Sequence, residues 1–150
     1  MLIAALPAAA GADASFERLK SLVGSWEAKT DKGIVIRVSY RMIAGESALV
    51  QSYVTPSGRE TLTIFHPDGP RLLATHYCGQ GNQPRLKLDA ASTAERLVFT
   101  FVDATNLTAG AAHLVRLELR LEGAQRYTGI ETYDGAGQAD VTTLDFHRVR

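Results

Sequence analysis

The chain has 150 residues, a length that suits one domain and is short for two. Its 16 basic and 16 acidic residues cancel, which argues against a nucleic-acid-binding protein, because such proteins carry a basic excess on one face. The single cysteine, Cys78, excludes an internal disulfide bond and a zinc site built from several cysteines.

The first 14 residues, MLIAALPAAAGADA, are small and mostly apolar, and we place the domain at residues 15–150. They end in Ala12-Asp13-Ala14, a pattern that signal peptidase accepts, although no positively charged segment precedes the apolar stretch. Two interpretations stay open: an export signal whose start codon was assigned too late, or a disordered alanine-rich tail. The first predicts a periplasmic or secreted protein, and the second leaves a cytoplasmic one. The stretch is shorter than the ~20 residues of a membrane-spanning helix, so no membrane span is predicted.

One short helix is predicted directly after this segment. Asp13 or Ser15 is suited to cap its N-terminus, and Gly24 is suited to end it. The apolar residues at helical spacing are Phe16, Leu19, Leu22 and Val23.

Beyond Gly24 the apolar residues alternate with period two, and turn residues separate the alternating runs. The clearest run is residues 113–121, in which charged Arg116, Glu118 and Arg120 must face water. The inward face then consists of His113, Val115, Leu117, Leu119 and Leu121. About ten strands are predicted, near residues 25–30, 34–42, 47–54, 60–66, 71–78, 84–89, 96–102, 113–121, 125–134 and 140–149.

Strands joined by short hairpins form an antiparallel meander, and closure of a long meander removes both exposed edges. The predicted fold class is therefore all-β: a roughly ten-stranded antiparallel up-and-down barrel with one short N-terminal helix. A barrel of eight or more strands is wide enough inside to hold packed side chains or one small ligand.

The order of these elements resembles a known group of barrels. A helix that runs into Gly24-Ser25-Trp26, followed by a meander that ends on Arg148, is similar to the calycin group, which includes lipocalins, fatty-acid-binding proteins and nitrobindin. The resemblance implies that Trp26 closes one end of a lipocalin-like barrel and that Arg148, or Arg150, packs on its ring. A guanidinium over an indole face is favourable, which agrees with this expectation.

A narrower resemblance covers most of the chain from Phe16 onward. The segments 75–85 (THYCGQGNQPR) and 101–107 (FVDATNL), the latter followed by His113, are similar to motifs of uncharacterised bacterial lipocalin-like proteins, many of them exported. Leu114 departs from the methionine that often follows this histidine in that family. The resemblance implies the barrel fold and no particular activity.

Polar side chains are expected inside the barrel at the predicted strand 71–78. His76 and Cys78 are two residues apart, so they project to one face together with Leu72 and Ala74. If that face lines the lumen, His113 joins them there. Buried polar groups need partners, and a bound ligand or a network closed within the protein supplies them.

The glycine-rich turn after this strand extends the candidate site to the rim of the barrel. It carries Asn82, Gln83 and Arg85, whose side chains are suited to a ligand's polar end. The alternative is that these three residues only shape the turn. The predicted ligand-binding residues are thus His76, Cys78, Asn82, Gln83, Arg85 and His113.

The leading hypothesis is a binding protein for a small, largely apolar ligand, without a cofactor. An enzyme with His76 or His113 as general base and Cys78 as nucleophile is the alternative, and a barrel that only mediates assembly is a third. A metal site on these three residues is not demanded by their spacing.

Haem is a further hypothesis, because nitrobindin-type barrels hold it by a histidine near the C-terminus. His147 lies on the last predicted strand, but its parity opposite Leu144 and Phe146 predicts an outward side chain. The glycines that extend Gly-x-Trp in those barrels are also missing here.

Overall fold

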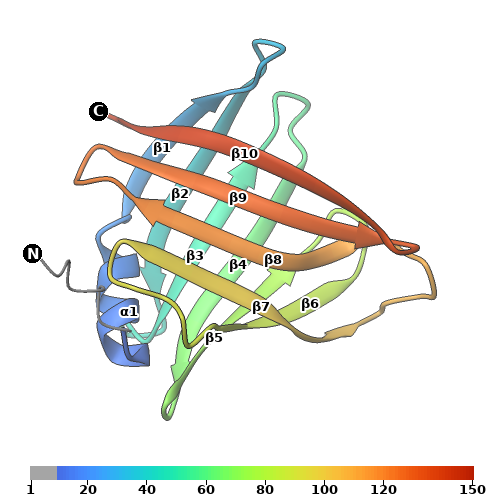
Figure 1. Cartoon of the computed structure of the whole chain (residues 1–150). Helices are drawn as coiled ribbons and strands as arrows, with labels where there is room; N and C mark the ends of the chain where they lie inside the picture. Colours follow the sequence, from blue (N-terminus) through green and yellow to red (C-terminus); the bar gives the residue numbers. More distant parts are fainter. Residues whose placement is uncertain (1–9) are drawn as a thin grey trace, which may run out of the picture.

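The computed structural model describes residues 10–150, in which one short helix precedes a closed barrel (Figure 1). Ten antiparallel strands follow each other around the barrel in chain order, and the pairing of the first with the last closes it. The all-β fold class is confirmed. The elements are α1 (Ala12–Lys20), β1 (Gly24–Lys29), β2 (Val35–Ile43), β3 (Ala48–Val54), β4 (Glu60–Asp68), β5 (Arg71–Tyr77), β6 (Gln83–Leu88), β7 (Arg96–Thr105), β8 (His113–Leu121), β9 (Arg126–Gly135) and β10 (Gln138–Val149).

The predicted strands are confirmed in number and order, and their ends shift by a few residues. The extension of β7 to Thr105, past the predicted end at residue 102, has a clear cause. The ladder between β6 and β7 changes register between Arg85 and Leu86, and pairing then continues to Gln83 opposite Thr105. Because such a bulge adds a residue to one strand, it lets pairing run on where alternation in the sequence is interrupted.

The helix begins and ends earlier than predicted. Its N-cap is Gly11, with no side-chain cap, so the prediction of Asp13 or Ser15 as cap is wrong. Asp13 instead lies in the first turn, where its negative charge interacts favourably with the positive end of the helix dipole. Ser15 is fully buried. The helix includes residues 12–14, which the sequence pattern had assigned to the leader segment. Residues 1–9 of that segment lie outside the described residues, so the role of the segment in export stays a prediction.

The two ends of the barrel differ. The helix α1 lies at one end of the barrel (Figure 1). It packs against β4 and β5, and its apolar residues Phe16 and Leu19 are buried. The hairpins that follow the even-numbered strands lie at this closed end, and those that follow the odd-numbered strands lie at the opposite, open end. No helix within residues 10–150 is long and apolar enough to cross a bilayer.

Candidate functional site

The closed end carries the aromatic–cation contact expected from the sequence. Trp26 is almost fully buried, and the guanidinium carbon of Arg148 lies 4.2 Å from the centre of its ring. Arg148 also donates hydrogen bonds to three backbone carbonyls, including those of Ser21 and Val23 just after α1. The indole N–H of Trp26 donates to the Leu22 carbonyl at 2.7 Å. These contacts attach the end of α1 to the last strand.

Gly24, predicted to end the helix, is instead the first residue of β1. Its φ of +129° is unfavourable for residues with a side chain, and a Cβ built there would lie 2.7 Å from Nη1 of Arg148. A glycine is therefore required here so that Arg148 can reach the carbonyls after α1.

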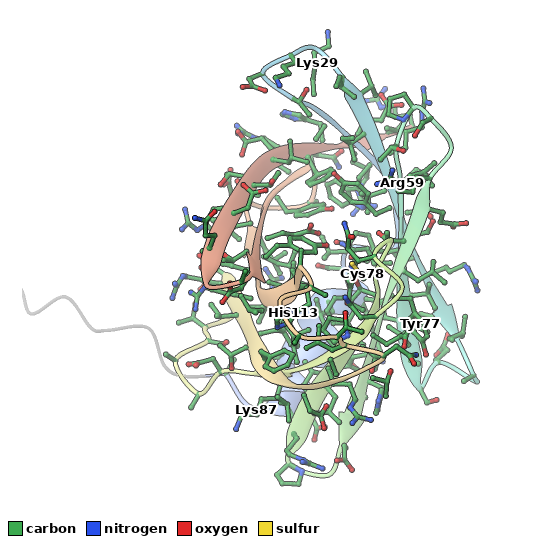
Figure 2. The ribbon with its side chains drawn as sticks, turned by 90° about the vertical axis from the view of Figure 1, so that its right-hand side faces the viewer. Lys29, Arg59, Tyr77, Cys78, Lys87 and His113 are labelled. Carbon is green, nitrogen blue, oxygen red and sulfur yellow. The ribbon has the colours of Figure 1, made fainter. Side chains whose placement is uncertain are left out.

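The open end holds a pocket of about 570 Å³. Side chains from β3, β4, β9 and β10 and from the turns after β3 and β5 line it. Figure 2 shows this end, with Cys78 inside the ring of strands and neighbouring Tyr77 pointing outward. The polar and charged residues of the lining are Tyr53, Thr55, Arg59, Thr61, Cys78, Gln80, Glu131, Tyr133, Gln138, Asp140 and Thr142.

A narrow crevice continues from this pocket toward the closed end. Tyr53, Glu131 and Thr142 line both spaces and mark where they join. The crevice has room for little more than a water molecule, about 20 Å³, and its floor consists of the stacked rings of Tyr127 and Phe146, 4.7 Å apart. Its remaining walls are Gln51, Leu117, Leu119, Gly129 and Leu144.

Glu131 is the carboxyl group at the junction of pocket and crevice. Burial raises its pKa to about 7, and the nearby Tyr133 hydroxyl acts in the opposite direction. Within residues 10–150 no basic side chain forms an ion pair with Glu131. Burial and the adjacent Glu131 raise the pKa of Tyr53 to about 12, so its phenol remains a hydrogen-bond donor near neutral pH. The junction thus combines phenolic donors with a carboxyl group that has no cation.

His76 lies behind the pocket wall and supports it. Its Nδ1 is 2.9 Å from the Thr63 hydroxyl, and its Nε2 is 3.1 Å from the hydroxyl of Tyr133, which lines the pocket. Burial lowers the pKa of His76 to about 4, so the imidazole is neutral and has one donor and one acceptor nitrogen. Tyr133 can donate toward Glu131 when Nε2–H donates to Tyr133 and Thr63 donates to Nδ1. The core therefore orients a hydroxyl that faces the pocket.

Below the crevice a second polar network is closed within the protein. Gln51 Nε2 donates to the Tyr40 hydroxyl at 2.8 Å, and Tyr40 and Tyr127 share a hydrogen bond of 3.2 Å. Both phenols are almost completely buried, and burial raises both pKa values. This network holds the rings that form the floor of the crevice.

The inward face predicted for β5 is confirmed, since Leu72, Ala74 and His76 are buried and Cys78 lines the pocket. The thiol of Cys78 accepts a hydrogen bond from the backbone N–H of Gln80 at 3.4 Å. Within residues 10–150 no imidazole lies within hydrogen-bond distance of this sulfur. In this part of the chain, neither His76 nor His113, the two bases predicted from the sequence, contacts the thiol.

The residues after β5 separate into inner and outer positions. Asn82 is buried and donates to the Ala112 carbonyl at 3.0 Å, immediately behind the pocket wall. Gln83 bonds to Thr105 and to residue 106 on the neighbouring hairpin. Arg85 forms a bidentate ion pair with Asp103, and both side chains are half exposed. Gln83 and Arg85 do not line the pocket, so the structure does not place them where they would hold the polar end of a ligand bound there, as the sequence had predicted.

The inward orientation predicted for His113 is also wrong. Leu114 pairs with Tyr133 and is completely buried, and the ladder between β8 and β9 then shifts register before Arg116. The bulge changes the parity of β8, so Leu114 takes the inner position that uninterrupted alternation assigned to its neighbour. His113 faces a separate surface pocket beside Asp134.

His113 is satisfied locally. Its Nδ1 lies 3.0 Å from the Ala111 carbonyl, and its ring packs edge-on against Phe101 with the ring centres 5.1 Å apart. The structure does not bring His113 together with His76 at the lumen pocket.

Two further features bear on the metal and haem hypotheses: the grouping of side chains that could ligate a metal, and the position of His147. No group of three or more His, Cys, Asp or Glu side chains in residues 10–150 is arranged to hold a metal ion. His147 is exposed on the outer face of β10, as predicted from its parity, and it does not line the lumen pocket.

Sequence reasoning missed the residues that form the junction. For Glu131 and Tyr133 a signal was present in the sequence. In β9 they lie on the same face of the strand as Tyr127 and Gly129, so two tyrosines accompany a carboxylate on that face. Tyr53 gave no such signal, because only barrel closure brings β3 to the same pocket as β9.

The fold and the pocket define a class: a closed antiparallel β-barrel with a ligand-sized space at one end. The chain is similar to the crystal structure of Rv2717c from M. tuberculosis, with a TM-score of 0.58 and 17% sequence identity over 91% of this chain and 98% of that one. At this identity the likeness establishes a shared barrel fold. No protein-family model matches the sequence, and no curated protein is similar enough in sequence to match.

Proposed function

We propose that this protein binds a small molecule in the lumen pocket at the open end of the barrel. The ligand's apolar part lies toward the crevice formed by Leu117, Leu119 and Leu144, and its polar part lies at Glu131. The observation that carries the proposal is a pocket of about 570 Å³ that continues into an aromatic-floored crevice in a barrel otherwise filled with side chains.

The dimensions and lining of the pocket support binding. Ligand pockets typically have volumes of about 300–1,000 Å³ and combine apolar walls with a few polar groups that fix orientation. Here the orienting groups are Glu131 and the phenols of Tyr53 and Tyr133. The calycin-type resemblance carried by Trp26 and Arg148 supports the same proposal.

Binding is favoured over thiol catalysis because no imidazole within residues 10–150 bonds to Cys78. We expect iodoacetamide to label Cys78 no faster than a cysteine in a short unstructured peptide, and a bound ligand to slow the labelling. The rate is measured by mass spectrometry near neutral pH. Labelling many times faster than the peptide would favour the enzyme instead.

A dye-displacement experiment tests the proposal, with an environment-sensitive naphthylamine dye as the probe. Thr142 lines both pocket and crevice, so Thr142→Trp places an indole in the ligand space and should weaken dye binding at least tenfold. Thr143→Trp is the matched control, because residue 143 is exposed on the opposite face of the same strand and pairs with Ile130.

Two results would overturn the proposal. One is wild-type protein that neither binds the dye nor carries a co-purified molecule in native mass spectrometry. The other is equal dye binding by the Thr142→Trp and Thr143→Trp variants.

We also propose that the protein is exported, on the basis of the Ala12-Asp13-Ala14 pattern. Cleavage after Ala14 would remove the first three residues of α1. Mass spectrometry of native protein tests this proposal, and an intact Met1 would end it.

A further inference from the structure

We propose that the ligand carries a cationic nitrogen, such as a protonated amine, and that this nitrogen pairs with the carboxylate of Glu131. The inference rests on the proposed function and specifies its ligand class. It follows from the position of Glu131, from the absence of an ion pair to it among the described residues 10–150, and from the rings around it.

First, Glu131 has a phenolic hydrogen-bond partner in Tyr133 but no cationic partner within residues 10–150. Its side chain lies deep in the lumen, where the junction of pocket and crevice removes much of its hydration. Carboxylates removed from water are normally paired with a cation or with several donors. In residues 10–150 this carboxylate forms no ion pair, in contrast to Glu118 on the outer wall, which three arginines surround. A ligand cation would supply the missing charge.

The second step is the aromatic environment. Tyr53 and Tyr133 line the pocket beside Glu131, and Tyr127 and Phe146 lie below it in the crevice. Aromatic faces attract cations by about 0.5–2 kcal/mol, more strongly where water is excluded. Rings around one carboxylate favour an ammonium group over a neutral or anionic group of the same shape.

The third step is the placement of the other charged groups. Arg59 and Asp140 line the pocket, but both side chains are exposed at its mouth. Cys78 lies in the wall, and His76 behind it is neutral near pH 7. The remaining titratable groups that interact with Glu131 are the phenols of Tyr40, Tyr53, Tyr127 and Tyr133, whose pKa values all lie above the usual value. Among the groups whose pKa is shifted here, Glu131 is the one whose pKa lies near 7.

Three probes of similar shape test the inference: 2-phenylethylamine, 2-phenylethanol and phenylacetate. We expect the amine to displace the naphthylamine dye at pH 7.5 at a concentration at least tenfold lower than the alcohol, and phenylacetate to be weakest. Equal or better displacement by the alcohol or by phenylacetate would overturn the inference.

Variants assign the preference to one residue. Glu131→Gln should reduce amine binding at least tenfold and leave the alcohol nearly unchanged. Glu60→Gln is the matched control, since Glu60 is exposed at the same end of the barrel, where it accepts a hydrogen bond from Ser52. Its affinity for the amine should equal that of the wild type. An amine affinity that Glu131→Gln does not lower would contradict the pairing.

The pH dependence provides a second measurement. Amine affinity should rise at least tenfold from pH 5.5 to pH 8, because Glu131 must ionise to pair, and Glu131→Gln should abolish this rise. A pH-independent or falling affinity would overturn the inference. Failure of the dye and of all three probes to bind would instead remove the proposed function itself, so the two failures are distinguishable.

Discussion

The hydroxyl of Tyr133 lies 3.1 Å from Nε2 of His76, so a phenol that lines the lumen pocket is held by an imidazole behind it. Thr63 occupies the other ring nitrogen at 2.9 Å. Such a network keeps a binding group in one orientation before the ligand arrives, which reduces the entropy lost on binding. Because the network joins core and pocket, substitutions of His76 or Thr63 behind the pocket wall should alter both stability and binding.

Replacing the central imidazole tests this network. His76→Leu removes the imidazole that bonds to the Thr63 and Tyr133 hydroxyls, and we expect it to lower the free energy of unfolding by about 1–3 kcal/mol and to weaken dye binding. Urea denaturation measures the first effect. In the double variant with Thr63→Val, an unpaired hydroxyl is removed, so the combined loss should be smaller than the sum of the two single losses. Strict additivity would argue against a coupled network.

His76 and Glu131 should act in opposite directions on the pH dependence of stability. His76 has a pKa of about 4 in the folded state and 6.5 when unfolded, so stability falls as pH decreases from 6.5 to 4. Glu131 has a folded pKa of about 7 against 4.5 unfolded, so stability falls as pH increases from 4.5 to 7. Each effect amounts to about 3 kcal/mol over its range.

The wild type should therefore show nearly constant stability between pH 4.5 and 6.5, where the two slopes cancel. In Glu131→Gln only the His76 effect remains, so stability should rise with pH through this window. Urea denaturation at several pH values measures both curves, and Glu60→Gln should follow the wild type. Parallel curves for wild type and Glu131→Gln would contradict the assignment of these two groups.

The close approach of Gly24 and Arg148 predicts a coupled pair of substitutions. Gly24→Ala places a methyl group against the Arg148 guanidinium at a φ of +129°, and Arg148→Ala removes the Trp26 contact and three hydrogen bonds. Each should cost about 1–3 kcal/mol. Because the clash needs both side chains, the double variant should lose less than the sum. Arg150→Ala, which removes a charge from the C-terminal residue, is the control and should have little effect.

Glu118 is the centre of an ion-pair cluster on the outer wall. It is 4% exposed and accepts hydrogen bonds from Arg96, Arg116 and Arg120. Burial alone would raise its pKa, but these three arginines outweigh that effect and lower the pKa to about 2.

We expect Glu118→Gln to cost about 2 kcal/mol at pH 7, because three guanidinium groups would then converge without a counter-charge. Arg120→Ala should cost less than about 1 kcal/mol, since two arginines remain. The stability from Glu118 is present above pH 4.5 and is lost as pH falls toward 2. Chemical denaturation at pH 7 and pH 3 measures the stability of each variant and its pH dependence. A larger loss of stability at pH 7 for Arg120→Ala than for Glu118→Gln would contradict the prediction.

Alternation along the chain determined the ten strands, their order, and the inward face of β5 with His76 and Cys78. These features depend on local chemistry, because side chains of a strand alternate between its two faces and turn residues mark its ends. The contact of Arg148 with Trp26 was also foreseen, from a resemblance that links the first and last strands.

Tertiary structure alone decided which residues form the binding space. The bulge between Leu114 and Arg116 reversed the parity at His113, and alternation has no means of placing such an insertion. Tyr53 and Glu131 line one pocket because the barrel closes. One end of the barrel remains open because α1 packs at the other end. These groups are positioned by the register of pairing between strands that are far apart in the sequence. No short stretch of sequence determines that register.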